Sequence, residues 1–347
     1  MRQAFRAQAE YCDRLGSRFT GALCATLAET LSMDSESGRL ALTWAGDPSP
    51  MADGLPLRVT GSLHALVRSG RAPELAAIYP PHDVPTPVVL ADVLGRVLIE
   101  HGAEIGAFLR HTPQTNEVGR SAVLIGGLLE IAKCTGLPLA LFEIGASAGL
   151  NLLPDQYRYR LGAADWGPPE ARVRLAPEWT GGRVGVEAPF SVQIRRGCDI
   201  NPIDIHDADQ RDRLRSYVWP DQPERLDRLD AAIDTALAVD FSLDRADAAD
   251  WVEAVLVAEP PPGVARVLYH SIVWSYLSEA TRTRVLEHIN GLGRMCSSRA
   301  PFAWLRFELE PQHAEARLRL SMWPGGTEQV LAAAHPHGAS IQWRATA

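Results

Sequence analysis

A glycine-rich turn directly after an apolar segment is the feature that most constrains how this chain can fold. The segment Leu139–Ile144 is apolar except for Glu143, and it opens into Gly145-Ala-Ser147-Ala-Gly149. A short apolar run that is bounded by turn residues is typical of a buried strand. We expect a helix after the turn, because a strand, a glycine turn and a helix in this order place backbone N–H groups and a helix N-terminus beside a ligand.

The rest of the second half predicts a sheet around this strand. Further apolar segments lie at 191–194, 241–246, 264–269 and 302–307. Strands that alternate with helical segments predict a parallel sheet covered on both faces. The last apolar segments, 316–323, 329–333 and 340–343, are joined by short turns and predict an antiparallel edge. We therefore predict an α/β fold that is Rossmann-like, with a mainly parallel sheet and an antiparallel C-terminal edge.

The first third of the chain has a helical pattern. Apolar residues recur at three- and four-residue steps from Phe5 to Leu31, with an interruption at Gly16-Ser17. Shorter helices are expected at 61–69, 73–78 and 86–108, and a further helix at 118–134. We predict an N-terminal helical cap domain over 1–116 and a Rossmann-like domain over 117–347. An insertion at about 157–189 is expected to form a hairpin over one end of the sheet.

Composition limits the partners that we expect. The chain has 347 residues, 34 Lys and Arg against 42 Asp and Glu, and a formal charge of −8. An acidic chain has no broad attraction to nucleic acid or to an anionic membrane, so neither is expected as a partner. Five scattered cysteines without a C-x-x-C spacing are typical of buried thiols in a reducing compartment. No signal segment or membrane-spanning segment is visible, and we expect a cytoplasmic protein.

The glycine turn distinguishes between two cofactor classes. A dinucleotide loop has the pattern G-x-G-x-x-G, and here Ser147 and Leu150 stand where its second and third glycines belong. The turn instead resembles the acidic-x-G-x-x-x-G loop of class I S-adenosylmethionine-dependent methyltransferases, with Ser147 in place of the middle glycine. This resemblance implies that Glu143, Gly145, Ser147 and Gly149 lie at the amino-acid end of S-adenosylmethionine. The alternative is a turn that only connects a strand to a helix.

Two later carboxylates extend the same resemblance. Asp199 corresponds to the acidic residue after the second strand of these methyltransferases, which binds the ribose hydroxyls. Asp247 resembles the acidic residue after the third strand, which binds the adenine amino group. The alternative for each is a helix N-cap, a position that aspartate favours. About fifty residues separate Gly149 from Asp199, roughly twice the separation expected of a compact βαβ unit, and the insertion accounts for the excess.

Three longer segments resemble a second group of proteins. The strings EIGASAGLNLLPDQYRYRLG, PQTNEVGR and YHSIVWSY are similar to those of a bacterial family of conserved hypothetical proteins, over nearly the whole chain. This resemblance supports the architecture and leaves the reaction open.

Candidate catalytic residues lie after the fourth predicted strand. His270 has a side chain whose ordinary pKa lies near neutrality, so it is our candidate general base. Trp274 or Tyr276 could contact a sulfonium through a cation–π interaction. The alternative for both aromatic residues is a place in the core.

A second cluster of polar residues lies at the junction of the two predicted domains. Gln114, Glu117 and Arg120 are our candidates for an acceptor pocket, because amide and charged groups gather there within a few residues. Thr115 or Asn116 alternatively caps the helix that starts in this segment.

A weaker set consists of Arg58, Gly61 and His64 in an apolar helical segment. A single histidine on an apolar helix face is most simply a core residue. His335 and His337 have no acidic or cysteine partner at ligand spacing, and we expect no metal.

Together these features predict an S-adenosylmethionine-dependent methyltransferase. Its methyl acceptor would be a small molecule or a protein side chain. The alternative is a non-catalytic nucleotide-binding or regulatory protein that has kept the fold. A nicotinamide-dependent oxidoreductase is disfavoured by Leu150.

Overall fold

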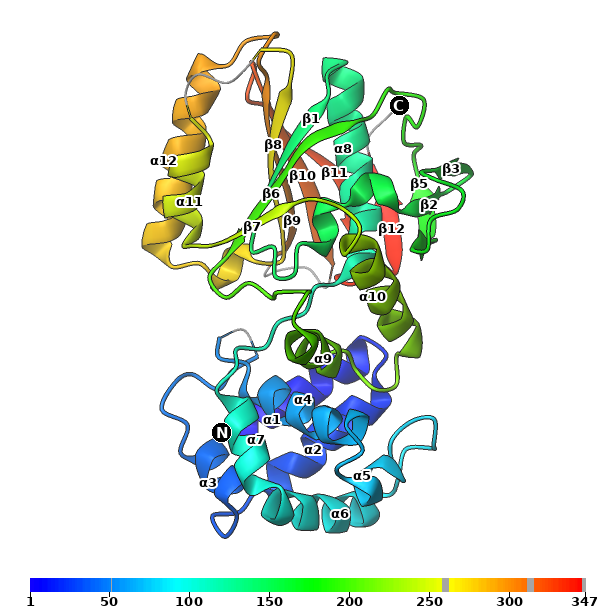
Figure 1. The fold of residues 1–347 in the computed structure, drawn as a ribbon, viewed down its shortest axis with the longest axis vertical. Helices are drawn as coiled ribbons and strands as arrows, with labels where there is room; N and C mark the ends of the chain where they lie inside the picture. Colours follow the sequence, from blue (N-terminus) through cyan, green and yellow to red (C-terminus); the bar gives the residue numbers. More distant parts are fainter. Residues whose placement is uncertain (51, 258–261, 311–314, 345–347) are drawn as a thin grey trace. The chain divides into compact units, whose positions relative to one another are not determined.

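The computed structural model describes residues 1–50, 52–257, 262–310 and 315–344. It divides into two compact units (Figure 1). The first unit consists of Met1–Thr115 and Asp207–Asp227, and the second of Asn116–His206 and Arg228–Ala347. The return of residues 207–227 to the first unit is not among the predictions from the sequence.

The first unit is helical. Its helices are α1 (Arg2–Arg14), α2 (Arg18–Thr30), α3 (Glu36–Leu42), α4 (Leu55–Arg68), α5 (Pro73–Ala76), α6 (Pro87–Glu100), α7 (Gly102–Leu109) and α9 (Ala208–Ser216). The predicted interruption at Gly16-Ser17 is confirmed, since α1 ends and α2 begins on either side of it. The spaced apolar side chains of the sequence form one core, with Phe5, Phe19 and Leu27 at most 1 % exposed.

The returning segment 207–227 completes the start of α2. Ser17, the residue before α2, makes no capping hydrogen bond with its own side chain. The Asp221 carboxylate takes this role, because it accepts hydrogen bonds from Ser17 Oγ at 2.5 Å and from Phe19 N at 2.9 Å. An anionic group at a helix N-terminus is favourable for both its hydrogen bonds and its charge. A residue about 200 positions along the chain therefore supplies a helix cap.

The second unit is built on a nine-stranded sheet in the order β5-β12-β11-β10-β9-β8-β1-β6-β7. Its strands are β1 (Leu139–Ile144), β5 (Glu178–Gly181), β6 (Val192–Asp199), β7 (Ser242–Arg245), β8 (Ala265–Ser271), β9 (Phe302–Leu309), β10 (Ala316–Trp323), β11 (Glu328–Ala334) and β12 (Ser340–Trp343). The pairs β1–β6, β1–β8, β6–β7 and β8–β9 are parallel, and β9 to β12 are joined by antiparallel pairs. The predicted α/β fold with an antiparallel C-terminal edge is confirmed.

Helices cover both faces of this sheet (Figure 1). On one face lie α11 (Ala248–Val255) and α12 (Glu279–Met295), whose Trp251 and Val285 join Phe142 of β1 in one apolar core. On the other face lies α8 (Ser121–Thr135), where a side chain at Gly126 would collide with the ring of Trp343. The glycine thus lets α8 approach the sheet closely.

Two shorter parts complete the second unit. Within the predicted insertion, β2 (Arg158–Leu161) and β3 (Ala164–Trp166) form an antiparallel hairpin, and β4 (Arg174–Leu175) pairs with β2 in parallel. The helix α10 (Pro223–Ala236) contains the point at which the chain passes from the first unit into the second. Among the described residues, no helix has both the length and the apolar character needed to cross a membrane.

The buried His64 makes the stability of the first unit depend on pH. Burial lowers the pKa of His64 to about 4, and the charge of Arg68 lowers it further. The carbonyl oxygen of Ser216, 3.2 Å from Nδ1, raises the pKa by a smaller amount. A histidine in the unfolded chain binds a proton near pH 6.5, whereas the buried ring stays neutral. The folded state therefore loses stability as the pH falls from 6.5 towards 4, by up to about 3 kcal/mol.

We predict that His64→Asn removes most of this pH dependence, because asparagine keeps a donor near Ser216 and does not titrate. The measurement is the free energy of unfolding by urea at several pH values between 4 and 7. The exposed His82 provides a control, and His82→Asn should leave the slope unchanged. An unaltered slope in His64→Asn would contradict the assignment.

Candidate functional site

The central parallel strands place the glycine turn, Asp199 and His270 at their carboxyl ends. The parallel strands lie in the order β7-β6-β1-β8-β9, which is the order 3-2-1-4-5 when they are counted along the chain. The order reverses at β1, between β6 and β8. In open α/β sheets, ligands bind outside the carboxyl ends of the strands at such a switch point. The glycine turn follows β1, and Asp199 and His270 lie at the ends of β6 and β8.

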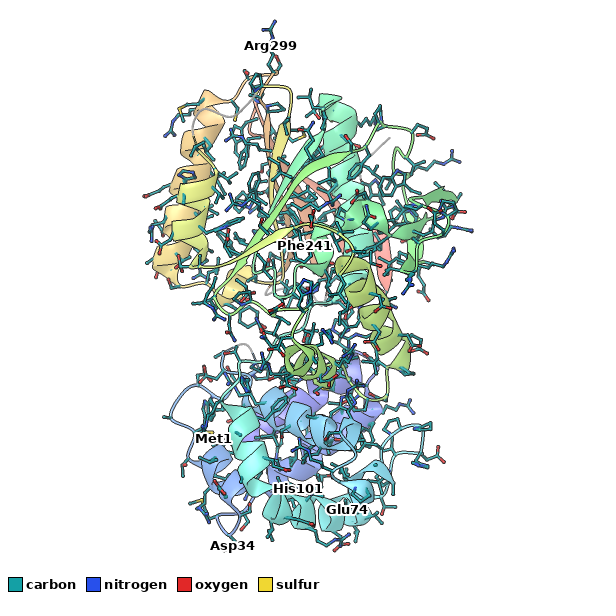
Figure 2. All side chains as sticks on the ribbon, in the orientation of Figure 1. Met1, Asp34, Glu74, His101, Phe241 and Arg299 are labelled. Carbon is teal, nitrogen blue, oxygen red and sulfur yellow. The ribbon has the colours of Figure 1, made fainter. Side chains whose placement is uncertain are left out.

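The backbone conformation of the glycine turn and the side chains packed against it both require glycine at two positions. Gly145, Ser147 and Gly149 have φ angles of 66°, 54° and 74°, in the left-handed region that favours glycine. A side chain at Gly145 would collide with Val273, and one at Gly149 would collide with the ring of Phe241 (labelled in Figure 2). Both glycines are thus needed for the packing of the second unit.

The helix that we expect after the turn does not form, and this expectation was wrong. Two short 3-10 turns follow instead, η2 (Leu150–Leu152) and η3 (Pro154–Gln156). The physical reason is Pro154, because a proline disfavours the α conformation at the residue before it, and Leu153 has φ −111° and ψ 39°. Asn116 Oδ1 accepts hydrogen bonds from Ala148 N at 3.1 Å and from Leu150 N at 3.0 Å. A long-range side chain therefore satisfies backbone donors that a helix N-terminus would offer to a ligand.

The carboxylate of Asp199 binds the middle of the turn, at Ser147. Its Oδ2 accepts a hydrogen bond from Ser147 N at 2.9 Å, and its Oδ1 accepts one from Asn201 N at 2.8 Å. The side chain is partly exposed. The turn after the first parallel strand and the carboxylate after the second are therefore in direct contact, although 52 positions separate them in the sequence.

Asp247 occupies the position of a helix cap. Its Oδ1 accepts a hydrogen bond from Ala249 N at 2.8 Å at the start of α11, and its Oδ2 accepts one from Thr281 Oγ1 at 3.2 Å. The alternative interpretation of this residue as an N-cap is confirmed. Its role towards adenine stays a prediction.

Glu143 lies inside the sheet rather than at its surface. It is 1 % exposed, and its Oε2 lies 3.5 Å from Tyr269 Oη on the neighbouring strand β8. Tyr269 Oη donates a hydrogen bond to the carbonyl oxygen of Asn151 at 3.0 Å. Burial raises the pKa of Glu143 well above its usual range, and the hydrogen bond with Tyr269 opposes this only in part. A protonated Glu143 can donate to Tyr269, which completes the chain of hydrogen bonds to Asn151.

His270 forms a buried pair with Glu308 of β9. His270 is 0 % exposed, and its Nδ1 lies 2.6 Å from Glu308 Oε1. The same oxygen accepts hydrogen bonds from Val273 N at 3.0 Å and from Trp274 N at 3.3 Å. The indole of Trp274 stacks on the imidazole, with 5.1 Å between ring centroids. In the neutral tautomer that donates Nδ1–H to Glu308, Nε2 carries a lone pair, the form that a general base requires.

Two buried nitrogen atoms here have no hydrogen-bond partner among the described protein atoms. One is Nε2 of His270 itself, and the other is Nε1 of the neighbouring Trp304. The rings of His270 and Trp304 lie 6.0 Å apart between centroids. A buried unpaired polar group costs roughly 1–3 kcal/mol, so such groups are often associated with function.

The predicted acceptor residues are distributed over both units. Arg120 donates from Nη1 to the carbonyl oxygen of Ser271 at 2.9 Å, and from Nε to that of Pro336 at 3.0 Å. Glu117 is buried, accepts a hydrogen bond from Gly119 N and lies 3.6 Å from Arg228 Nη1. Gln114 belongs to the first unit. The structure thus places Arg120 against Ser271, the residue after His270 at the end of β8, and assigns Gln114 to a different unit.

The weaker candidates have structural roles. Arg58 donates to the carbonyl oxygens of Asp53, Leu109 and His111 within the first unit. Gly61 lies against the ring of Tyr217, where a side chain would not fit.

The aromatic candidates after β8 differ from each other. Trp274 packs on His270, whereas Tyr276 is 50 % exposed.

A groove of about 560 Å³ lies elsewhere in the second unit, and Gln156, Arg172 and Asp234 are among its lining residues. It contains none of the predicted site residues.

Sequence reasoning missed two residues of this site, Asn116 and Glu308. Asn116 resembled a local helix cap, and no local pattern reveals its contact with a turn 32 positions away. Glu308 lies near the end of the predicted strand 302–307. The parallel pairing of β8 with β9, which places His270 opposite Arg306, could have indicated it.

The buried Glu143 generates a prediction about pH. A carboxyl group whose pKa is raised in the folded state keeps its proton there but loses it in the unfolded state above about pH 4.3. Stability therefore falls as the pH rises above that value. We predict that Glu143→Gln weakens this fall, so that the variant gains stability relative to the natural protein between pH 5 and pH 8. Urea unfolding at each pH measures the effect.

The exposed Glu187 supplies a matched control for this experiment. Glu187→Gln should follow the natural protein at every pH. If Glu143→Gln also did so, Glu143 would be ionised in the fold.

One family matches this chain almost from end to end. Residues 2–343 match the family described as "Uncharacterized protein conserved in bacteria (DUF2332)". No curated protein and no solved structure matches the chain. The family match confirms the bacterial family that three sequence segments indicated. The chain therefore belongs to this conserved bacterial family.

Proposed function

We propose that the second unit binds S-adenosylmethionine at the carboxyl ends of β1 and β6 and transfers its methyl group to a small molecule or a protein side chain. The observation that carries the proposal is the hydrogen bond from Ser147 N to Asp199 Oδ2. It joins a glycine turn after the first parallel strand to a carboxylate after the second. The 3-2-1-4-5 strand order places both at the switch point, where ligands bind in open sheets.

The donor and acceptor groups at this edge fit an adenosyl group. A carboxylate offers several acceptor positions, which suit two neighbouring ribose hydroxyls. Asp199 is partly exposed and held in place by Ser147 and Asn201. The residues that would hold the cofactor are therefore Asp199 and the turn from Gly145 to Gly149.

The same turn is poorly suited to a dinucleotide. A pyrophosphate requires backbone N–H donors and a helix N-terminus. Here no α-helix follows the turn, and Asn116 and Asp199 accept its N–H groups. S-adenosylmethionine has no phosphate, so the loss of these donors matters less for it. This difference supports the methyltransferase proposal over a nicotinamide-dependent oxidoreductase.

The chain supplies its own candidate base for the reaction. When bound, the cofactor supplies a methyl group on a positively charged sulfonium. His270 Nε2 would accept the proton from an O–H or N–H of the acceptor as the new bond forms. Glu308 holds the imidazole through Nδ1 and would stabilise the positive charge that the ring gains. Trp274 fixes the plane of the ring by stacking.

The first test is ligand binding. We predict that S-adenosylhomocysteine raises the thermal unfolding midpoint of the full chain by a few degrees, whereas NAD and NADP do not. A ligand at a hundred times its dissociation constant stabilises by about 2.7 kcal/mol. Differential scanning fluorimetry with each compound in excess measures the shift. Absence of any shift with S-adenosylhomocysteine would contradict the proposal.

Two variants then separate the ribose contact from the shape of the turn. Asp199→Ala should weaken the binding of S-adenosylhomocysteine by about 10- to 100-fold, as expected for hydrogen bonds to a charged group. Asn116→Ala loosens the same turn without removing a charge, so its effect should be smaller. Isothermal titration calorimetry measures both. Equal losses would mean that Asp199 acts only by shaping the turn.

A third variant tests the proposed base. We predict that His270→Gln lowers methyl transfer by a factor of about 10² to 10⁴, the usual contribution of a general base, and leaves the affinity for S-adenosylhomocysteine unchanged. Transfer of labelled methyl groups from S-adenosylmethionine into small-molecule and protein fractions of a bacterial extract provides the assay. His288→Gln, in α12 of the same unit, is the control. Undiminished transfer by His270→Gln would remove His270 from the reaction.

One observation favours a second candidate, a non-catalytic nucleotide-binding or regulatory protein. Val273 covers Gly145 and Phe241 covers Gly149, so the unit's own side chains lie where a ligand would contact the turn. Binding of S-adenosylhomocysteine without labelled product in either fraction would support this candidate.

A further inference from the structure

The first unit contains a group of metal-ligating side chains that the proposed function does not use. Glu74 lies in α5, Glu100 ends α6, and His101 stands between α6 and α7. One potential ligand atom from each residue lies within 4.8 Å of the other two. Figure 2 labels Glu74 and His101 in this helical unit. Two carboxylate oxygens and one imidazole nitrogen could thus converge on a single cation.

The histidine of this group is held by a fourth residue. His101 Nδ1 lies 2.8 Å from Glu104 Oε2, and Glu104 Oε1 accepts a hydrogen bond from Arg71 Nη1 at 2.9 Å. A carboxylate that binds one imidazole nitrogen fixes the orientation of the ring and makes the other nitrogen a better metal ligand. The side chain of His101 is only 12 % exposed. Nε2 is therefore the nitrogen left for a metal ion.

The two carboxylates lack a compensating positive charge. In the part of the chain that the structure describes, neither Glu74 nor Glu100 forms an ion pair or a side-chain hydrogen bond. Arg71, the nearby cation, is paired with Glu104 instead. Two like charges at about 4 Å repel each other by about 1 kcal/mol even in water. A divalent cation between Glu74 and Glu100 would turn this repulsion into attraction.

We propose that Glu74, Glu100 and His101 bind a divalent transition metal ion, with Glu104 as the residue that positions His101. Imidazole together with carboxylates is a common ligand set for Zn²⁺, and three protein ligands leave the fourth position to water. The ion would link α5, which has only four residues, to the end of α6. This site is independent of the methyltransferase proposal, because all of its residues lie in the first unit.

The test is the binding of ZnCl₂ to the untagged full-length chain after treatment with EDTA, followed by isothermal titration calorimetry. We expect one equivalent to bind at this site and to raise the thermal unfolding midpoint. Glu100→Gln and His101→Gln should each weaken this binding at least tenfold, and Glu104→Gln should weaken it by about 10- to 100-fold. Glu100 is exposed, so its substitution leaves the fold intact even if another variant fails to fold.

Matched controls come from the same unit. Glu10 and His82 are exposed and lie outside the group, so Glu10→Gln and His82→Gln should bind Zn²⁺ as the natural chain does. The proposal is overturned if the natural chain binds no Zn²⁺. It is equally overturned if Glu100→Gln and His101→Gln bind Zn²⁺ as tightly as the controls, since the ion would then lie at other residues.

Discussion

The contact between Asn116 and the glycine turn determines the character of the predicted cofactor site. One amide oxygen accepts two backbone N–H groups of the turn. These groups would otherwise be available to bind an anion. The chain after Gly149 continues in two short 3-10 turns and then in the insertion. What resembles a nucleotide loop in the sequence is a turn whose donors are bound within the unit.

The proposed base, His270, forms a buried pair with Glu308 at the ends of neighbouring strands. Glu308 Oε1 accepts two backbone N–H groups in addition to the imidazole. A carboxylate bound in this way has little freedom to move, so the imidazole has one preferred orientation. The enclosed Nε2 can act on an acceptor only after neighbouring side chains have moved. Any reaction here would therefore begin with local opening of the segment after β8.

Local patterns predicted the regular parts of the fold well. The strands β8, β9 and β10 and the break between α1 and α2 follow from apolar spacing and from turn residues, which act over a few positions. The helix after the glycine turn was predicted by the same local logic and is absent. Pro154 ends the segment locally, whereas the contact of Asn116 with the turn spans 32 positions and has no local signal.

The candidate site was predictable only in part for the same reason. Asp199 and His270 follow strands, and strand ends can be placed from the sequence. Their partners, Ser147 and Glu308, are determined by strand order and register, which no single segment encodes. Gln114 and Glu117 are close in the sequence but fall on either side of the division between the two units.

The discontinuous first unit has a consequence for the order in which the chain can fold. Residues 1–115 emerge from the ribosome long before Asp221, which supplies the cap of α2, and Tyr217, which packs on Gly61. The helical unit therefore stays incomplete during synthesis until the strands β1 and β6 of the central sheet have been made. A fragment that ends at the first boundary would lack these contacts permanently. The first unit can thus be completed only after part of the second unit has been synthesised.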